Sequence, residues 1–457
     1  MTYSDFLKTK EDEQIRAGFT VNRADLNQNE FPYQKDIVEW ALRKGKAAVF
    51  SDCGTGKSLM QLDFADQVCK KTGGNALIVA PLAVAEQTRQ EGIKFGIASK
   101  VCRTQKDVEP GINITNYEML DHFDETAFNC VVLDESSILK SFTSSTRNLL
   151  IDKFHNTPYK LCCTATPSPN DHTELGNHAE FLGIMSRTEM LATYFIHDGS
   201  DTSKWRLKGY GEQRFWEWVA TWAVCVRDPS DLGYSKDGFE LPELRIIEHQ
   251  IVTPLDDYEL IQTRAESLSE RRDARKKSLP LRVEESKRLT EETDDQYLVW
   301  CDFNDESAAL HAAITESTEV VGSDQPDRKA TAALDFASGK IRVLVSKPSI
   351  YGFGMNWQNC HNIIFCGLSD SFEQFYQALR RCWRYGQENT VTAHIVISDR
   401  EMNILDNVKK KQSQMETMQA NMIDLMREVT MREMKKTTRI TETYITEKKM
   451  EVPAWIA

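Results

Sequence analysis

The sequence predicts an α/β protein made of two units in tandem, each built on a parallel sheet. Short apolar runs of strand length end at a small or polar residue and alternate with amphipathic segments of helical periodicity. This is the pattern of parallel strands joined by crossover helices. The alternation occurs twice, at about residues 30–225 and 295–400. Because 457 residues are too many for a single core, length alone predicts two or three domains.

Five runs in the first unit have the length and composition of buried strands. In chain order they are AAVFSD, NALIVAP, INITN, CVVLDE and KLCCTAT. Segments such as PYQKDIVEWALRKG and LAVAEQTRQEGIKFG lie between some of them and predict helices. The stretch from Asp171 to Arg227 is rich in tryptophan and phenylalanine. We therefore expect a helical, aromatic insertion, at about 171–240, that folds onto this unit.

The second unit shows four further strand-like runs, QYLVWCD, IRVLVSK, HNIIFCG and TAHIVIS. Between the units, the charged segment LSERRDARKKSLPLRVEESKRLTEETDD predicts a helical linker or protrusion. After about residue 405 the chain becomes long-helical, and its loosely spaced methionines favour a packing surface over a binding groove. We therefore expect a first lobe at 1–245, a linker or protrusion at 246–295, a second lobe at 296–405 and a helical tail at 406–457.

Net charge, apolar runs and cysteine spacing argue against several classes of protein. The net charge of -13 and the pI of about 5.3 argue against a protein that coats nucleic acid through overall basicity, while a local basic cleft is compatible with both. No apolar run has the length of a transmembrane helix, and the amino-terminal residues lack the apolar stretch of a secretory signal. The 11 cysteines show no C-x-x-C spacing and indicate reduced thiols. We expect a cytoplasmic protein without membrane contact.

The stretch VFSDCGTGKSLM, from Val49 to Met60, predicts a phosphate-binding loop, because a strand-like run leads into glycines, a lysine and a helical segment. Glycines let backbone N–H groups approach phosphates, and the following helix N-terminus favours negative charge. The predicted nucleotide contacts of this loop are Gly54, Thr55, Gly56, Lys57 and Ser58. Lys57 would neutralise the β- and γ-phosphates, and the Ser58 hydroxyl would bind Mg²⁺. The alternative is a glycine-rich turn with a surface lysine.

A second motif, CVVLDESS, places Asp134 and Glu135 at the end of an apolar strand. Next to a phosphate-binding loop, Asp134 would hold Mg²⁺ directly or through water. Glu135 would then polarise the attacking water as a general base. The pair could also cap a helix, but that alternative accounts for this motif alone.

These motifs resemble those of the superfamily-two helicases, and most of all the Swi/Snf type. In that family the first motif is G-x-G-K-[ST] without an upstream glycine, often preceded by an acidic residue, here Asp52. The resemblance extends from about residue 30 to 400 through VAPLAVAEQTRQE, ITNYEML, DESSILKS and TATPSPNDHTEL. It implies two tandem RecA-like P-loop domains, ATP and Mg²⁺ as cofactors, and adenine recognition by Gln34.

Two motifs of the second unit extend the resemblance. YGFGMNWQNCHNIIF is similar to the family's glycine-rich motif, which implies nucleotide contacts for Gly352 and Gly354. QALRRCWRYGQ matches the family's Q-A-x-x-R-x-x-R-x-G-Q motif, and this match implies a nucleotide contact for Gln377. The R-x-x-R spacing places two guanidinium groups on one helix face. Because an arginine supplied across an interface stabilises phosphoryl transfer, Arg384 is the expected arginine finger and Arg381 the expected γ-phosphate contact. A solvated basic helix face is the alternative.

The resemblance also implies an ATPase that nucleic acid stimulates and that tracks along DNA, in this branch commonly duplex DNA. Contacts to phosphate would be independent of base sequence and sensitive to salt. The expected nucleic-acid contacts are Asn116, Tyr117, Lys140, Asn356 and Trp357. Trp357 could instead be a core residue, because aromatic residues after such a glycine-rich turn are more often packed. The basic cluster Arg271, Arg272, Arg275, Lys276 and Lys277 is compatible with a duplex-facing protrusion or with a solvated helix face.

The leading hypothesis is therefore a DNA-dependent ATPase that translocates on duplex DNA in replication, repair, recombination or protein displacement. Its alternatives are a strand-separating helicase and an ATP-gated recruitment module whose helical tail binds a protein partner. The compact chain shows no recognisable chromatin-reading domain. It resembles bacterial and phage members of the family, so a bacterial cell or a phage-infected host is the expected setting.

Overall fold

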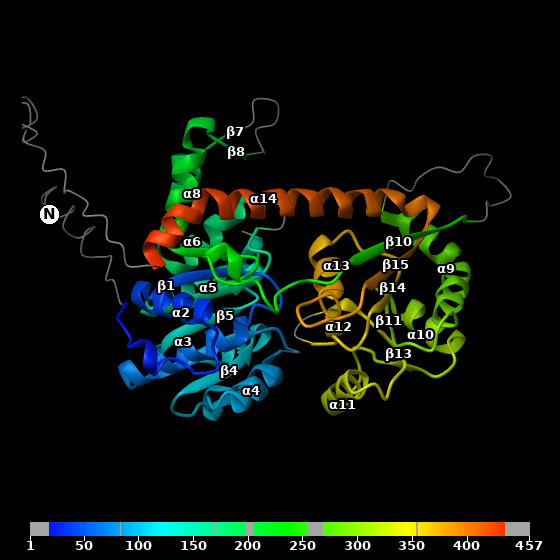
Figure 1. Ribbon diagram of the computed structural model, residues 1–457, viewed down its shortest axis with the longest axis horizontal. Coiled ribbons are helices and arrows are strands. Elements are labelled where there is room, and N and C mark those ends of the chain that lie inside the picture. The colour runs from blue at the N-terminus through cyan, green and yellow to red at the C-terminus, as the bar shows by residue number, and fades with distance from the viewer. Residues whose placement is uncertain are drawn as a thin grey trace, which may run out of the picture.

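The computed structural model consists of two α/β lobes that lie side by side, with one long helix running along an edge of both (Figure 1). It describes residues 18–82, 84–141, 143–168, 171–197, 205–253, 268–352 and 355–434. Both large sheets are parallel throughout, so the predicted α/β class with two parallel sheets is confirmed. None of the described helices combines the length and the apolar character that a membrane-spanning helix needs.

The first lobe is built on a seven-stranded sheet with the order β3-β4-β2-β5-β6-β1-β9. Its strands are β1 (Lys46–Ser51), β2 (Asn75–Ala80), β3 (Ser99–Val101), β4 (Ile112–Asn116), β5 (Phe128–Asp134), β6 (Tyr159–Thr164) and β9 (Ala223–Val226). Its helices are α2 (Pro32–Lys44), α3 (Lys57–Thr72), α4 (Ala85–Lys94), α5 (Ser145–Lys153), α6 (Leu175–Leu182), α7 (Arg187–Tyr194) and α8 (Glu212–Ala220). All five predicted strands form, as near-continuous apolar runs that are buried along most of their length.

The aromatic insertion folds onto this lobe as predicted. Trp216 and Phe215 of α8 are fully buried in the same core cluster as Phe50 of β1. The short hairpin of β7 (Phe195–His197) and β8 (Trp205–Leu207) projects from the lobe beside α8 (Figure 1).

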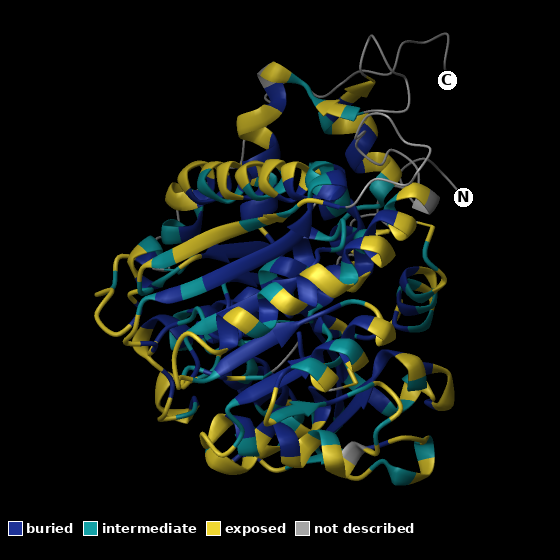
Figure 2. Ribbon diagram, turned by 90° about the vertical axis from the view of Figure 1, so that its right-hand side faces the viewer, coloured by how far each residue is buried: buried dark blue, intermediate teal, exposed yellow. Residues whose placement is uncertain are grey.

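The second lobe contains a six-stranded sheet with the order β10-β15-β14-β11-β13-β12. Its strands are β10 (Leu244–Ile251), β11 (Tyr297–Trp300), β12 (Ser317–Glu319), β13 (Val343–Ser346), β14 (Asn362–Cys366) and β15 (Val391–Ser398). Its helices are α9 (Leu268–Thr290), α10 (Asn304–Ala313), α11 (Pro326–Ala337), α12 (Pro348–Tyr351) and α13 (Phe372–Leu379). Figure 2 shows the inner strands buried, while exposed residues lie on the outer faces of the helices.

The segment 246–295, predicted as a linker or protrusion, belongs in the structure to the second lobe. Strand β10 pairs with β15 along its whole length, from Leu244 opposite Val391 to Ile251 opposite Ser398. Helix α9 packs on the same sheet, and two of its arginines are buried. Arg275 bonds Glu306 at 2.6 Å, and Arg282 bonds the same carboxylate at 2.9 Å. Two of the charged side chains that predicted a solvent-exposed linker helix are therefore buried inside the lobe and form ion pairs.

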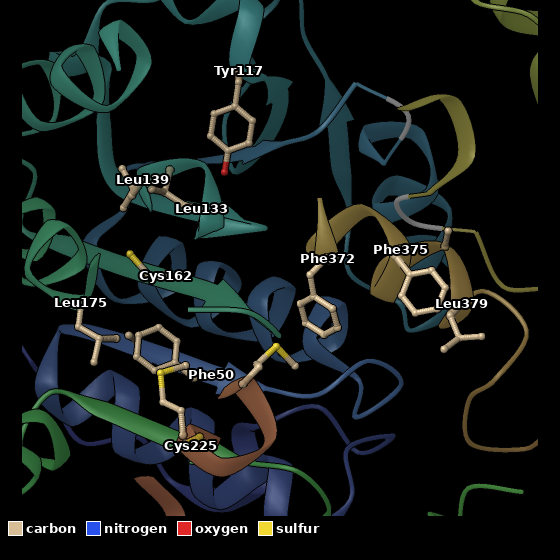
Figure 3. Packing of buried hydrophobic residues seen from close by; sticks show 14 of the residues in the cluster. Phe50, Tyr117, Leu133, Leu139, Cys162, Leu175, Cys225, Phe372, Phe375 and Leu379 are labelled. Carbon is tan, nitrogen blue, oxygen red and sulfur yellow. The ribbon is translucent and has the colours of Figure 1, made fainter. Parts of the chain in front are cut away.

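Helix α14 (Met402–Met434) follows the last strand of the second lobe and returns across the first lobe. Its methionines 415, 418, 422 and 426 are buried in a cluster that contains core residues of both lobes. Figure 3 shows this shared cluster, with Phe50 and Cys162 from the first lobe and Phe372 and Phe375 from the second. Packing is therefore confirmed for the methionine stripe. Residues 435–457 of the predicted tail lie outside the described residues.

Met422→Ala is expected to lower the free energy of unfolding by about 2–5 kcal/mol, because a fully buried methionine leaves a cavity when it is truncated. Urea denaturation followed by tryptophan fluorescence measures the change. Leu425→Ala is the matched control, because this residue of the same helix is 38% exposed. Equal destabilisation by both substitutions would contradict a packing role for the methionine face.

Candidate nucleotide site at the lobe interface

The loop between β1 and α3 has a conformation that depends on its glycines. Gly54 and Gly56 have φ angles of 89° and 84°, in the left-handed region that glycine tolerates. A Cβ atom at Gly56 would collide with the Gln34 amide, and one at Gly54 would lie 2.9 Å from the ring of Tyr385. Tyr385 belongs to the second lobe, so the loop is packed between α2 and the opposite lobe.

Polar contacts hold the loop from both sides. The Thr55 carbonyl accepts hydrogen bonds from Gln34 Nε2 at 2.7 Å and from the Tyr33 hydroxyl at 2.6 Å. Lys57 Nζ donates to the carbonyls of Ser51 at 2.7 Å and Asp52 at 2.9 Å. The ammonium group therefore rests on neutral acceptors at the base of the loop. Gln34, predicted to read adenine, instead contacts the loop itself and the backbone N–H of Phe31.

The two carboxylates at the end of β5 lie beside this loop. Asp134 accepts a hydrogen bond from Gln61 of α3 at 2.8 Å, and Glu135 accepts one from Thr164 at the end of β6 at 2.6 Å. Burial raises the pKa of both groups, that of Glu135 to about 7, while the positive charge of Lys57 opposes the shift. Glu135 also has a left-handed φ of 56°, an uncommon conformation for a residue with a side chain.

Ser58 is linked to a residue that sequence reasoning missed. Glu91 of α4 lies nearby, and burial raises the pKa of its carboxyl, while the Ser58 hydroxyl lowers it. Asp134 and Arg384 are near enough to shift the same carboxyl electrostatically. The structure thus brings together the two predicted metal ligands and the predicted arginine finger. Glu91 lies inside the quoted segment VAPLAVAEQTRQE, but its spacing carries no signal of its own.

The predicted arginines follow α13 in the second lobe. Arg381 donates to the Gln377 carbonyl at 2.9 Å and to the Met355 carbonyl at 3.0 Å, and Arg384 donates to Met355 at 3.4 Å. Burial and then the neighbouring Arg381 charge lower the pKa of Arg384 to about 10. The two guanidinium groups are therefore adjacent, but the predicted helix face is wrong, because α13 ends at Leu379 and both arginines lie in the turn that follows it. Met355, which orients both through its carbonyl, was not predicted.

Several buried donors at this interface lack a partner. The Nε2 of Gln377 and the Nε atoms of Arg380 and Arg384 have none among the described residues. Because buried polar groups are normally satisfied, these atoms fit a ligand with phosphate oxygens between the lobes. The glycine-dependent loop with Lys57 fits the same ligand. The residues therefore suit ATP, whose γ-phosphate supplies the phosphoryl group that is transferred.

Three further contacts between the lobes were not predicted. Arg380 Nη2 donates to Asp52 Oδ2 at 3.0 Å and to the Cys53 carbonyl at 2.7 Å. The Tyr376 hydroxyl donates to Asp52 Oδ1 at 2.7 Å. In the third contact, Lys140 pairs with Glu373 of α13. The adjacent arginines in ALRRCW are the one sequence signal that could have drawn attention to Arg380.

The structure corrects two of the predicted nucleic-acid contacts. Trp357 is 1% exposed, donates to the Ala333 carbonyl at 3.2 Å and packs against Phe336, so it is a core residue. The Tyr117 ring is also buried, and its hydroxyl donates to the Asp134 carbonyl at 2.6 Å. Both side chains pack against apolar neighbours, which the pattern of residues around a strand end does not reveal.

The other predicted contacts differ in accessibility. Asn116 is buried at the end of β4, Lys140 is half-exposed and paired with Glu373, and Asn356 is exposed. Gly352 ends α12, where a Cβ atom would collide with the Pro348 carbonyl. Gly354 lies outside the described residues. The nucleotide contacts of the two glycines stay predictions.

A cavity of about 370 Å³ lies at the carboxyl edge of the second sheet. Its basic and hydroxyl lining consists of Arg271, Arg272, Arg275, Lys347, Ser349 and Ser369. Arg271 and Arg275 are held by Asp370 and Asp302. Arg272 is exposed at the rim.

Comparison with known proteins gives two family matches. Residues 33–194 match the SNF2-related domain, and residues 282–386 match the helicase conserved C-terminal domain. Together the two stretches make up more than half of the chain. No curated protein is significantly similar in sequence. Among solved structures, the chain is similar to the Sulfolobus solfataricus SWI2/SNF2 ATPase core in complex with dsDNA. That match has 15% identity and a TM-score of 0.43, and it covers 91% of this chain and 99% of that one.

Proposed function

Because the chain belongs to the Swi/Snf type of superfamily-two helicases, and is therefore a nucleic-acid-dependent ATPase, we propose that it uses ATP and Mg²⁺ to translocate on duplex DNA. The observation that carries the proposal is the position of the predicted arginines. Arg381 and Arg384 closely follow Arg380 in the chain. The Arg380 guanidinium donates to the Cys53 carbonyl of the phosphate-binding loop at 2.7 Å, so these arginines lie where the second lobe meets the first. Catalytic groups divided between two lobes make hydrolysis depend on lobe closure.

Each residue has a role that its position supports. Lys57 would exchange its carbonyl partners for the β- and γ-phosphates, and Ser58 and Asp134 would hold Mg²⁺. Adenine recognition by Gln34 stays a prediction of the family resemblance, and it would require the Gln34 amide to leave the Thr55 carbonyl. Bound Mg²⁺ supplies charge compensation for the phosphates. Glu135, whose pKa burial raises to about 7, accepts a proton from the attacking water. Arg384 and Arg381 stabilise the charge that develops on the transferred phosphoryl oxygens.

The DNA backbone is proposed to cross the cavity at the carboxyl edge of the second sheet. Arg272 and Lys347 supply positive charge there, and Ser349 supplies a hydroxyl. Lys140 and Asn356 remain candidates for further backbone contacts. Contacts of this kind read phosphates and not bases. Binding should therefore be independent of base sequence and should weaken steeply as salt rises.

Duplex DNA is expected to stimulate ATP hydrolysis more than single-stranded DNA or RNA of the same length, and the stimulation should fall as salt increases. A coupled ATPase assay with the three nucleic acids, at several salt concentrations, measures this. Equal stimulation by single strands would contradict the duplex preference.

A second assay separates translocation from strand separation. A translocase on duplex DNA is expected to release the third strand of a triplex while it leaves a forked duplex paired. Efficient separation of the forked duplex would instead support the helicase alternative.

A further inference from the structure

One face of α13 and its last turn contacts the first lobe. Glu373, Tyr376 and Arg380 are spaced at i, i+3 and i+7, which places them on the same side of a helix. Glu373 reaches Lys140 and the Thr166 hydroxyl, while Tyr376 and Arg380 reach Asp52. The second lobe is therefore bonded directly to the phosphate-binding loop.

Arg380 is built into this contact as a buried charge. Its side chain is 0% exposed, and its guanidinium group lies 5.8, 5.0 and 5.6 Å from the rings of Tyr376, Trp383 and Tyr385. Arginine stacks well on aromatic rings, and a desolvated charge gains more from its partner than a solvated one. Removal of Asp52 would leave this charge without its carboxylate, which is costly in a buried site.

Asp52 connects this arginine with the lysine of the loop. Its carboxylate oxygens accept from Tyr376 and Arg380, while its carbonyl accepts from Lys57. One residue of the loop therefore binds groups of both lobes at once. Arg380 Nη2 also holds the next carbonyl, that of Cys53.

We propose that Asp52, Tyr376 and Arg380 form an interlobe latch that holds the two lobes closed without nucleotide. In this assignment Arg380 is a positioning residue. By fixing the turn after α13 against the loop, it keeps Arg381 and Arg384 facing the phosphates. The consequence for catalysis rests on the proposed ATPase motor, whereas the closed arrangement itself does not.

Lobe closure can be measured without ATP or nucleic acid. Donor and acceptor dyes are placed on unnatural amino acids at Ile93 of α4 and Leu334 of α11, which are 59% and 71% exposed in different lobes. We expect Asp52→Asn, Tyr376→Phe and Arg380→Gln each to lower the energy-transfer efficiency. Asp52→Asn combined with Arg380→Gln should lower it by less than the sum of the two single losses, because both changes break the bond between Asp52 and Arg380.

The matched control is Arg328→Gln, which removes an exposed arginine paired with Asp324 inside the second lobe. It should leave the energy transfer unchanged. Tyr376→Phe deletes a single hydroxyl, and circular dichroism checks that every variant is folded. Wild-type energy transfer in folded Tyr376→Phe and Asp52→Asn variants would overturn the latch, as would fully additive losses in the double variant.

The activity of the same variants gives a second readout. Arg380→Gln is expected to lower kcat more than it raises the KM for ATP, and Arg380→Lys should recover part of kcat because it restores the charge. A purely structural role would not separate these two variants at equal folded content, and such a result would overturn the positioning role. If the wild-type chain shows no stimulation by DNA, the proposed function fails while the energy-transfer test of the latch still stands.

Discussion

Lys57→Ala is expected to reduce ATP hydrolysis to background, with or without duplex DNA. The ammonium group is the positive charge at the loop that can neutralise the β- and γ-phosphates, and alanine offers neither charge nor donor. In the structure Lys57 Nζ contacts two backbone carbonyls, of Ser51 and Asp52. Ser51 ends β1, and the Asp52 N–H donates to the Val226 carbonyl of β9 at 3.0 Å, so both residues are also held by other contacts. Loss of turnover should therefore occur in a folded protein. A coupled ATPase assay measures turnover, and circular dichroism measures folding.

Lys70→Ala is the matched control for this experiment. Lys70 lies in the last turn of the same helix, is largely exposed and pairs with Asp66. An exposed i,i+4 pair contributes little to stability, so turnover should remain at the wild-type level. Normal hydrolysis by Lys57→Ala would show that the loop between β1 and α3 does not bind the transferred phosphate.

The strands and the phosphate-binding loop were predictable from sequence because each has a local cause. A buried parallel strand needs a near-continuous apolar run, and β1, β2 and β5 have one. The loop needs glycine where φ is positive, and Gly54 and Gly56 supply it. Each of these patterns can be recognised within a short, continuous stretch of sequence.

The residue at which the second lobe begins was not predictable from such local patterns. Strand β10 is an edge strand with mostly half-exposed or exposed side chains, so its sequence lacks an apolar run. Helix α9 is among the most charged segments, and its Arg275 and Arg282 are buried only because Glu306 of α10 meets both. That partner lies more than twenty residues along the chain, beyond any local pattern.

The same distinction between local motifs and contacts across the fold applies to the residues of the candidate site. The residues that motifs define, such as Lys57, Asp134 and Arg384, gather at one interface between the lobes. The residues missed, Glu91, Tyr376 and Arg380, gain their roles through contacts across the fold. Trp357 follows a glycine-rich turn as a DNA contact could, but tertiary packing places its ring in the core.

Arg384→Ala is expected to slow ATP hydrolysis by ~10³-fold or more while ATP binding stays largely intact, as for an arginine that acts on the transition state. The structure gives the reason for this division. The phosphate-binding loop belongs to the first lobe, whereas Arg384 belongs to the second and bonds the Met355 carbonyl of its own lobe. Its Nε has no partner among the described residues, so a donor is available for a developing charge. Single-turnover hydrolysis and binding of a fluorescent ATP analogue measure the two effects separately.

Two further variants identify which arginine acts. Arg384→Lys keeps a positive charge but loses the planar fork that suits phosphate oxygens, so it should recover only a small part of the rate. Arg381→Ala should weaken ATP binding as well as hydrolysis, because Arg381 is the expected γ-phosphate contact in the ground state. Unchanged turnover in Arg384→Ala, with a large loss in Arg381→Ala, would assign the finger to Arg381. Both guanidinium groups donate to the carbonyl of Met355. That result would therefore move the role by three residues within the turn after α13, and closure of the lobes would still be required.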